Sequence, residues 1–244
     1  MEYSFFALGI MGLAAMIAGI SKTGLPGLGV LLAALVPMVM PAKESTGYVL
    51  PFLIAGDFIA VFYWRNNAIW RIILAILPAM AVGIIAGYFA MNHIDDAVYG
   101  KALGGMVLFL SALDWLSRRF NIPMPQNSRL FGHMTGFLAG ILTMLANAAG
   151  AVMVLYLLAM RISKEEFVGT SAWLFLFVNL FKVPFSMALG LITIESLKIN
   201  LMLLPCMLIG CVLGVIMLRK LSGKGFEFLV RSLAVLGGVK LLFS

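Results

Sequence analysis

The stretch IAGISKTGLPGLGVLLAALVP, residues 17–37, is an apolar run that is interrupted in its middle. A soluble core has no use for such a break, and a simple membrane anchor has no use for a lysine within it. The stretch therefore predicts a helix that is broken inside a membrane-embedded protein. The residues that interrupt the run are Ser21, Lys22, Thr23, Gly24, Pro26, Gly27 and Gly29.

The composition supports this environment. The 244 residues are 63% hydrophobic and 11% charged, whereas ordinary globular domains are about 45–50% apolar and about 25% charged. Long uninterrupted apolar runs do not fit barrel strands, so we expect an all-α polytopic membrane protein that uses the lipid bilayer as its solvent. The net charge of +7 is scattered singly over short loops, which favours topology signals over nucleic-acid binding.

A membrane-spanning helix needs about 20 mainly apolar residues. Two of the predicted segments, 27–41 and 149–160, are shorter and cover only about 22 and 18 Å as helices. Each follows a break, and the sequence leaves open whether it is a half-helix, a re-entrant arm or a tilted short span. The predicted segments lie near residues 4–20, 27–41, 46–64, 71–91, 97–117, 130–146, 149–160, 167–190, 198–218 and 226–243.

The second half of the sequence repeats features of the first half in the same order. Each half contains about five apolar segments, and an odd number inverts the second half relative to the first. We therefore predict two inverted repeats, residues 1–125 and 126–244, with paired broken helices, as is typical of secondary transporters. The matched features are the break near Gly24 with that at Asn147, Ala42-Lys43-Glu44 with Ser163-Lys164-Glu165, Asp57 with Asn179, and Pro78, Gly83 and Gly87 with Pro205, Gly210 and Gly214.

The loop charges predict the orientation, because lysine and arginine are in excess on the cytoplasmic side. If loops are counted alternately, one side holds Lys43, Lys101, Lys198 and Lys240. Both termini are then expected on this non-cytoplasmic side of a bacterial inner membrane. The opposite side holds the larger set, which is Arg65, Arg71, Arg118, Arg119, Arg129, Arg161, Lys164, Arg219, Lys220 and Lys224.

The two breaks are predicted to bind an anion. An unwound turn exposes backbone groups that lipid cannot satisfy, and the helix that follows it begins with free N–H donors and partial positive charge, which suit anions. Glycine lets an oxyanion approach the chain closely. The alternatives are that the glycines serve close helix packing and that Lys22 extends to the interface. The predicted binding residues here are Ser21, Lys22, Thr23, Gly24, Gly27, Asn147 and Gly150.

A second group of polar residues lies within the segment 167–190. Lys182 is near its middle, where a charge costs roughly 2.5–3.5 kcal/mol and is usually functional or paired. Asn179 lies three residues earlier on the same face, and Thr170 begins the segment. We expect these residues to contact the anion, or, in the case of Lys182 and Asn179, to gate its passage. The alternative is that Lys182 forms an ion pair with Asp57. Asp57 is also the candidate residue for proton coupling.

Four stretches resemble the TauE/SafE family of sulfite and organosulfonate exporters. They are GISKTGLPGLG, ANAAG, KEEFVGTSAW and NLFK, and the resemblance extends over essentially the whole chain. It implies an anion permease with a pseudo-twofold site between the repeats and an outward direction of transport.

We therefore expect a secondary transporter that moves a small anion, such as a sulfur oxyanion or organosulfonate, without ATP. The alternatives are a passive anion channel and a non-transporting membrane scaffold. No phosphate-binding loop or hydrolase motif occurs, so we expect no enzyme activity, no cofactor and no metal. The sequence leaves the oligomeric state open, a homodimer included.

Overall fold

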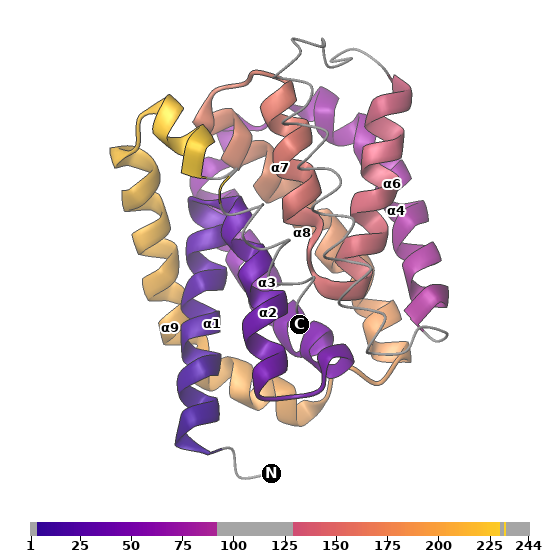
Figure 1. Cartoon of the computed structure of the whole chain (residues 1–244), viewed down its shortest axis with the longest axis vertical. Coiled ribbons are helices and arrows are strands. Elements are labelled where there is room, and N and C mark those ends of the chain that lie inside the picture. Colours follow the sequence, from indigo (N-terminus) through magenta and orange to yellow (C-terminus); the bar gives the residue numbers. More distant parts are fainter. Residues whose placement is uncertain (1–3, 92–128, 230–231, 233–244) are drawn as a thin grey trace.

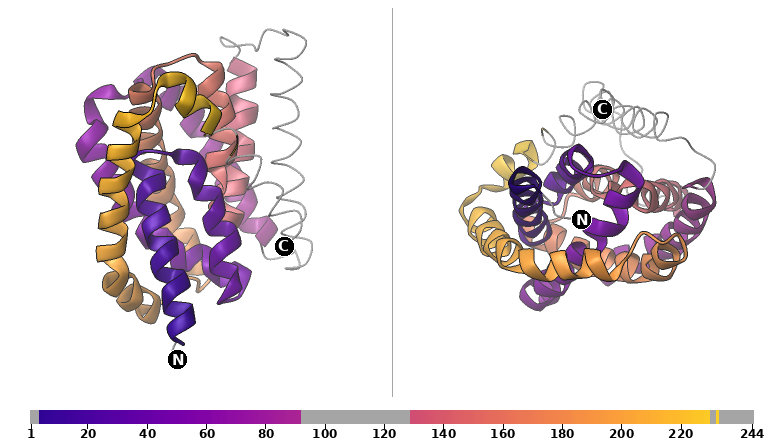
Figure 2. Two further views of the ribbon diagram at one scale, coloured as in Figure 1. Left: turned by 60° about the vertical axis from the view of Figure 1, so that its left-hand side comes forward. Right: turned by 90° about the horizontal axis from the view of Figure 1, so that it is seen from below.

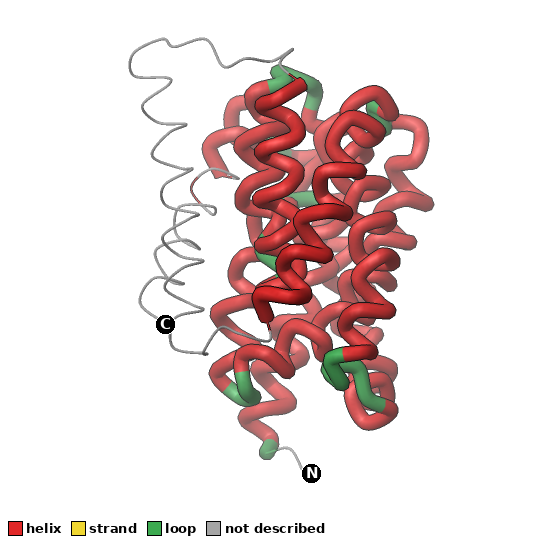
Figure 3. The backbone as a smooth tube through the Cα atoms, turned by 90° about the vertical axis from the view of Figure 1, so that its right-hand side faces the viewer, coloured by secondary structure: helices red, strands yellow, loops and turns green. Residues whose placement is uncertain are grey.

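The computed structural model describes residues 4–91, 129–229 and 232, and these residues form α-helices and short 3-10 helices without any strand (Figures 1 and 3). The predicted segment 97–117, most of 226–243 and the boundary between 1–125 and 126–244 lie outside them. The elements are α1 (Phe5–Thr23), η1 (Pro26–Leu31), α2 (Leu32–Leu35), η2 (Val36–Met38), α3 (Ala42–Trp64), η3 (Arg65–Asn67), α4 (Trp70–Met91), α6 (Arg129–Ala146), α7 (Ala149–Ala159), α8 (Lys164–Ala188) and α9 (Ile194–Lys220).

Six described helices are long and apolar enough to cross a membrane, namely α1, α3 with η3, α4, α6, α8 and α9. Their outer faces expose large apolar side chains, such as Phe62 at 75% and Leu201 at 72%, whereas Asp57 and Lys182 are buried at 0% and 2% exposure. Exposed apolar groups and buried charges fit a lipid surround. The prediction of an all-α protein with several membrane-spanning helices is confirmed.

The short segment after the first break, whose form the sequence leaves open, is helical but changes between 3-10 and α geometry along its length. The chain passes from η1 through the four-residue α2 to η2. Pro26 opens η1, and Pro37 lies in the first turn of η2. Proline lacks the N–H of the helical bond and clashes with the preceding turn, so α2 cannot continue. The second short segment is the continuous helix α7, as predicted.

Glycines let two pairs of helices approach closely. A Cβ atom on Gly210 of α9 would collide with the carbonyl oxygen of Met16 on α1, and one on Gly83 of α4 would collide with that of Phe137 on α6. Such contacts of small residues drive helix association where lipid removes the hydrophobic force. Gly83 and Gly210 therefore serve close helix packing.

The two breaks meet inside the bundle. In Figures 1 and 2, α1 and α2 form a hairpin that enters the bundle from the end where the N-terminus lies, and α6 and α7 form a hairpin that enters from the opposite end. The helices α3 and α8 pack against each other, and η1 packs against α7. A Cβ atom on Gly150 would lie 3.0 Å from the carbonyl oxygen of Pro26, so the two breaks are in direct contact.

Candidate functional site

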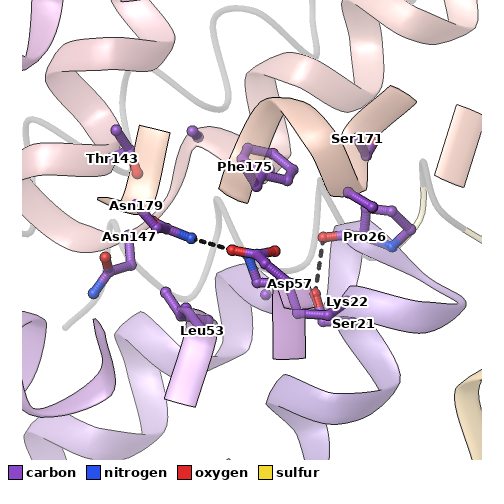
Figure 4. Close-up of a pocket in the computed structure, with 14 residues that line it drawn as sticks. Ser21, Lys22, Pro26, Leu53, Asp57, Thr143, Asn147, Ser171, Phe175 and Asn179 are labelled. Carbon is purple, nitrogen blue, oxygen red and sulfur yellow. Dashed lines mark hydrogen bonds and ion pairs between the residues drawn. The ribbon is translucent and has the colours of Figure 1, made fainter. Parts of the chain in front are cut away.

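A cavity of about 30 Å³ lies where the breaks meet (Figure 4). A space of this size accommodates about two water molecules, which suits a compact ligand. It is lined by segments from both halves of the chain, namely α1, η1, α3, α6, α7 and α8. The lining residues are Ser21, Lys22, Pro26, Gly29, Leu53, Asp57, Thr143, Asn147, Ala149, Gly150, Ser171, Ala172, Phe175 and Asn179.

An ion pair lies at the contact between the halves. Lys22 Nζ on α1 lies 2.7 Å from Asp57 Oδ1 on α3, and it also lies 4.7 Å from the ring centroid of Phe175. The side-chain amide of Asn179 on α8 donates a hydrogen bond of 2.6 Å to Asp57 Oδ2, as Figure 4 shows. Asp57 and Asn179, which the sequence comparison matches between the two halves, thus bind each other directly.

Lys182 has a different environment. Its ammonium group donates to Thr143 Oγ1 at 3.3 Å and to the side-chain oxygen of Asn147. Both acceptors are neutral, and Lys182 has no carboxylate within ion-pair distance among the described residues. The expected alternative, an ion pair of Lys182 with Asp57, is wrong because Lys22 takes that place. Within the part of the chain that the structure describes, Lys182 is therefore a buried cation without a paired anion.

The break after α6 is fixed by Asn147. This residue has a φ of 54°, a left-handed conformation that asparagine tolerates better than most residues. Its N–H bonds the carbonyl of Thr143, which closes the end of α6. Its side-chain amide donates a hydrogen bond of 2.9 Å to the carbonyl of Thr46. No side chain caps the start of α7, so the first N–H groups of α7, beside Gly150, remain available as donors.

The break after α1 is held by hydrogen bonds and close packing. Ser21 donates to the carbonyl of Pro26 at 3.3 Å. Thr23 donates to the carbonyls of Gly19 and Cys211, so its hydroxyl faces α9 instead of the cavity. Gly24 packs against the backbone of Gly214, where a Cβ atom would collide.

The predicted binding residues thus separate by position. Thr170 accepts a hydrogen bond of 3.0 Å from the N–H of Ile69 at the start of α4, so the structure does not bring it to the cavity. Thr23 and Gly24 are likewise turned to the helix packing, and Gly27 lies within η1. Six predicted residues line the cavity wall. Lys182 is not among them, but it donates a hydrogen bond to Asn147, which is. These six are Ser21, Lys22, Asn147, Gly150, Asn179 and Asp57.

Sequence reasoning missed three cavity residues that carry chemistry. Thr143 lies one helical turn before Asn147, and this spacing could have indicated that its side chain is near the break. Ser171 and Phe175 are four residues apart on α8, and Asn179 follows Phe175 at the same spacing, so one helix face reaches the cavity. A search for polar residues at this spacing before Asn179 finds Ser171.

The charges of the site suit an anion. Lys182, which is buried, and Lys22, whose side chain is 9% exposed, lie near the buried carboxylate of Asp57, so the described residues leave an excess of positive charge beside the cavity. Free amide donors of α7 add to it. The described residues contain no group of three or more histidine, cysteine or acidic side chains placed to hold a metal ion.

Comparison with known proteins agrees with this chemistry. A family model described as sulfite exporter TauE/SafE matches residues 11–241, nearly the whole chain. No curated protein and no solved structure matches the chain. The extent of the match shows that this multi-pass membrane protein belongs to the sulfite exporter TauE/SafE family.

Proposed function

We propose that this protein is a secondary transporter that exports a small oxyanion of sulfur, with sulfite as the first candidate, through the cavity at the two breaks. The observation that carries the proposal is Lys182, a cation at 2% exposure with only neutral hydrogen-bond partners beside this cavity. An uncompensated charge in a membrane protein is expensive, and a bound anion supplies the missing counter-charge. The small cavity favours sulfite over bulkier organosulfonates.

Alternating access in this proposal uses two inverted repeats, residues 1–125 and 126–244. The packing of the described helices supports the relation. If α1, η1, α3 and α4 are exchanged with α6, α7, α8 and α9, the pair α1–α9 becomes α6–α4, and α3–α9 becomes α8–α4. The pairs α3–α8 and η1–α7 are unchanged by the exchange, and this supports a cavity on the proposed twofold axis. The short segments η1–α2–η2 and α7 are the re-entrant arms of this arrangement.

Asp57 is the proposed site of proton coupling, because it is the carboxylate at the cavity. Lys22 and Lys182 are the charged groups near it. An anion that draws Lys22 away from Asp57 makes protonation of Asp57 easier. The double variant Lys22→Met/Asp57→Asn should therefore transport without dependence on a pH gradient, and a gradient dependence equal to that of the wild type would contradict the coupling role.

The first test is the thermal stability of the detergent-purified protein with sulfite, thiosulfate, sulfoacetate, taurine, acetate, phosphate and chloride. A ligand at 100 times its Kd adds about 2.7 kcal/mol to the folded state. We expect a selective shift with sulfite that Lys182→Met abolishes and that Lys198→Met, at an exposed lysine of α9, leaves intact. A wild type that no anion stabilises would favour the scaffold alternative.

Flux into proteoliposomes separates the transporter from the channel. A transporter saturates with sulfite concentration and responds to the coupled ion, whereas a passive channel with the same site does not couple. Lys182→Met is expected to reduce sulfite flux at least about 100-fold, the loss that corresponds to about 2.7 kcal/mol of binding. Equal flux in Lys182→Met and Lys198→Met would remove the central part of the proposal.

A further inference from the structure

The hydroxyl group of Ser171 differs from every other polar side chain that lines the cavity. Ser171 is 3% exposed, and its Oγ has no hydrogen-bond partner among the residues that the structure describes. The remaining polar side chains of the wall are all engaged: Lys22 with Asp57, Asn179 with Asp57, Ser21 with Pro26, and Thr143 and Asn147 with Lys182.

A serine within a helix usually turns its hydroxyl back to the carbonyl four residues earlier. Ser171 makes no such bond, whereas the hydroxyl oxygen of the neighbouring Thr170 accepts a hydrogen bond from the N–H of Ile69. A buried hydroxyl without a partner is unfavourable, so its persistence at the cavity wall needs a reason outside the protein's own hydrogen bonds. The same wall contains Ala149 and Gly150 at the uncapped start of α7. Ser171 and the first residues of α7 thus line the same small space.

We propose that Ser171 donates its hydroxyl hydrogen bond to an oxygen atom of the transported anion, and that it determines the preference of the site for oxyanions. This inference rests on the proposed function. Lys182 supplies charge through the Asn147 side of the cavity, and Ser171 with the α7 amides supplies directed donors on α8 and α7. An oxyanion presents several acceptor oxygens to such separate donors. Ser171 is therefore a substrate-contacting residue with no structural bond of its own.

The test uses Ser171→Ala in the full-length purified protein, with sulfite as the probe. Because the hydroxyl has no partner in the protein, the unfolding midpoint without ligand should stay the same or rise. The Kd for sulfite should increase about 10- to 100-fold, the loss of one hydrogen bond to a charged group. Ser186→Ala is the matched control, since Ser186 is a buried serine of α8 that does not line the cavity. It should leave the Kd unchanged.

The outcomes separate the two proposals. Ser171→Cys keeps the size of the side chain but donates weakly, so it should raise the Kd less than Ser171→Ala and serves if the alanine variant does not fold. An unchanged Kd in both Ser171 variants, with loss of binding in Lys182→Met, would overturn the role of Ser171 and leave the proposed function standing. A wild type that binds none of the anions would overturn both.

Discussion

The break after α1 and the break after α6 meet at one cavity, but the lysines beside them are compensated differently. Lys22 forms an ion pair of 2.7 Å with Asp57, whereas Lys182 is held by the neutral side chains of Thr143 and Asn147. A paired charge is satisfied within the protein. A buried charge without a partner favours a ligand of opposite sign, so the comparison separates a lysine whose charge is compensated by Asp57 from one that lacks a counter-charge among the described residues.

The backbones of the two breaks differ as well. Gly24 has a φ of −143°, which other residues adopt, but a Cβ atom there would collide with the backbone of Gly214. Asn147 has a φ of 54°, which most residues adopt only with strain. The first break therefore needs glycine for space, and the second needs a residue that tolerates a left-handed angle. Both residues allow the helix to end at the cavity, Gly24 by leaving space for the neighbouring helix and Asn147 by adopting a left-handed backbone angle.

The largest expected effect comes from breaking the Lys22–Asp57 pair. Asp57→Asn leaves Lys22 buried without its counter-charge, and we expect the free energy of unfolding to fall by about 3–5 kcal/mol. Thermal unfolding of the purified variant in detergent measures this. The double variant Lys22→Met/Asp57→Asn replaces the pair by neutral groups and should recover most of the loss. If Asp57→Asn were as stable as the double variant, the ion pair of Lys22 with Asp57 would not stabilise the fold.

A smaller effect is expected where glycines hold helices together. Gly210→Ala in the α1–α9 contact and Gly83→Ala in the α4–α6 contact each force a Cβ atom against a carbonyl oxygen, and overpacking costs about 1–3 kcal/mol. The two losses should be similar because the contacts are alike. Gly9→Ala is the control, since nothing lies within 4 Å of its Cβ position, and it should stabilise α1 by about 0.5–1 kcal/mol. Comparable unfolding midpoints for all three variants would argue against the close packing.

Much of the fold follows from the sequence because lipid imposes simple rules. Apolar runs of sufficient length become helices, and the positions of Gly83 and Gly210 at small-residue spacing predict helix contacts. The matched offsets also place Asp57 opposite Asn179, and these two side chains bind each other. Each of these features depends on spacing along one chain, which the sequence displays directly.

The details of the site depend on helix rotation and partner choice, which spacing does not fix. Asn179 and Lys182 share one face of α8, yet Asn179 reaches Asp57 and Lys182 reaches Asn147. Thr170 and Ser171 are adjacent, and only Ser171 faces the cavity. A rotation of about 100° per residue separates such neighbours, so their roles follow from the tertiary packing of α8 between α3 and α4.

The smallest expected effect tests the angle at Asn147. Asn147→Gly and Asn147→Ala both remove the side-chain bonds to Lys182 and Thr46, but only alanine suffers at a φ of 54°. We therefore expect Asn147→Ala to be less stable than Asn147→Gly by about 1 kcal/mol, as measured by thermal unfolding. At the first break, Gly24→Ala is unfavourable for a different reason, because its Cβ atom would collide with the backbone of Gly214. The strain of Asn147→Ala arises from the backbone angle of residue 147 itself, so a shift of a neighbouring helix does not relieve it. Equal stability of the two Asn147 variants would mean that the second break relaxes to another angle, and the contrast between the breaks would be lost.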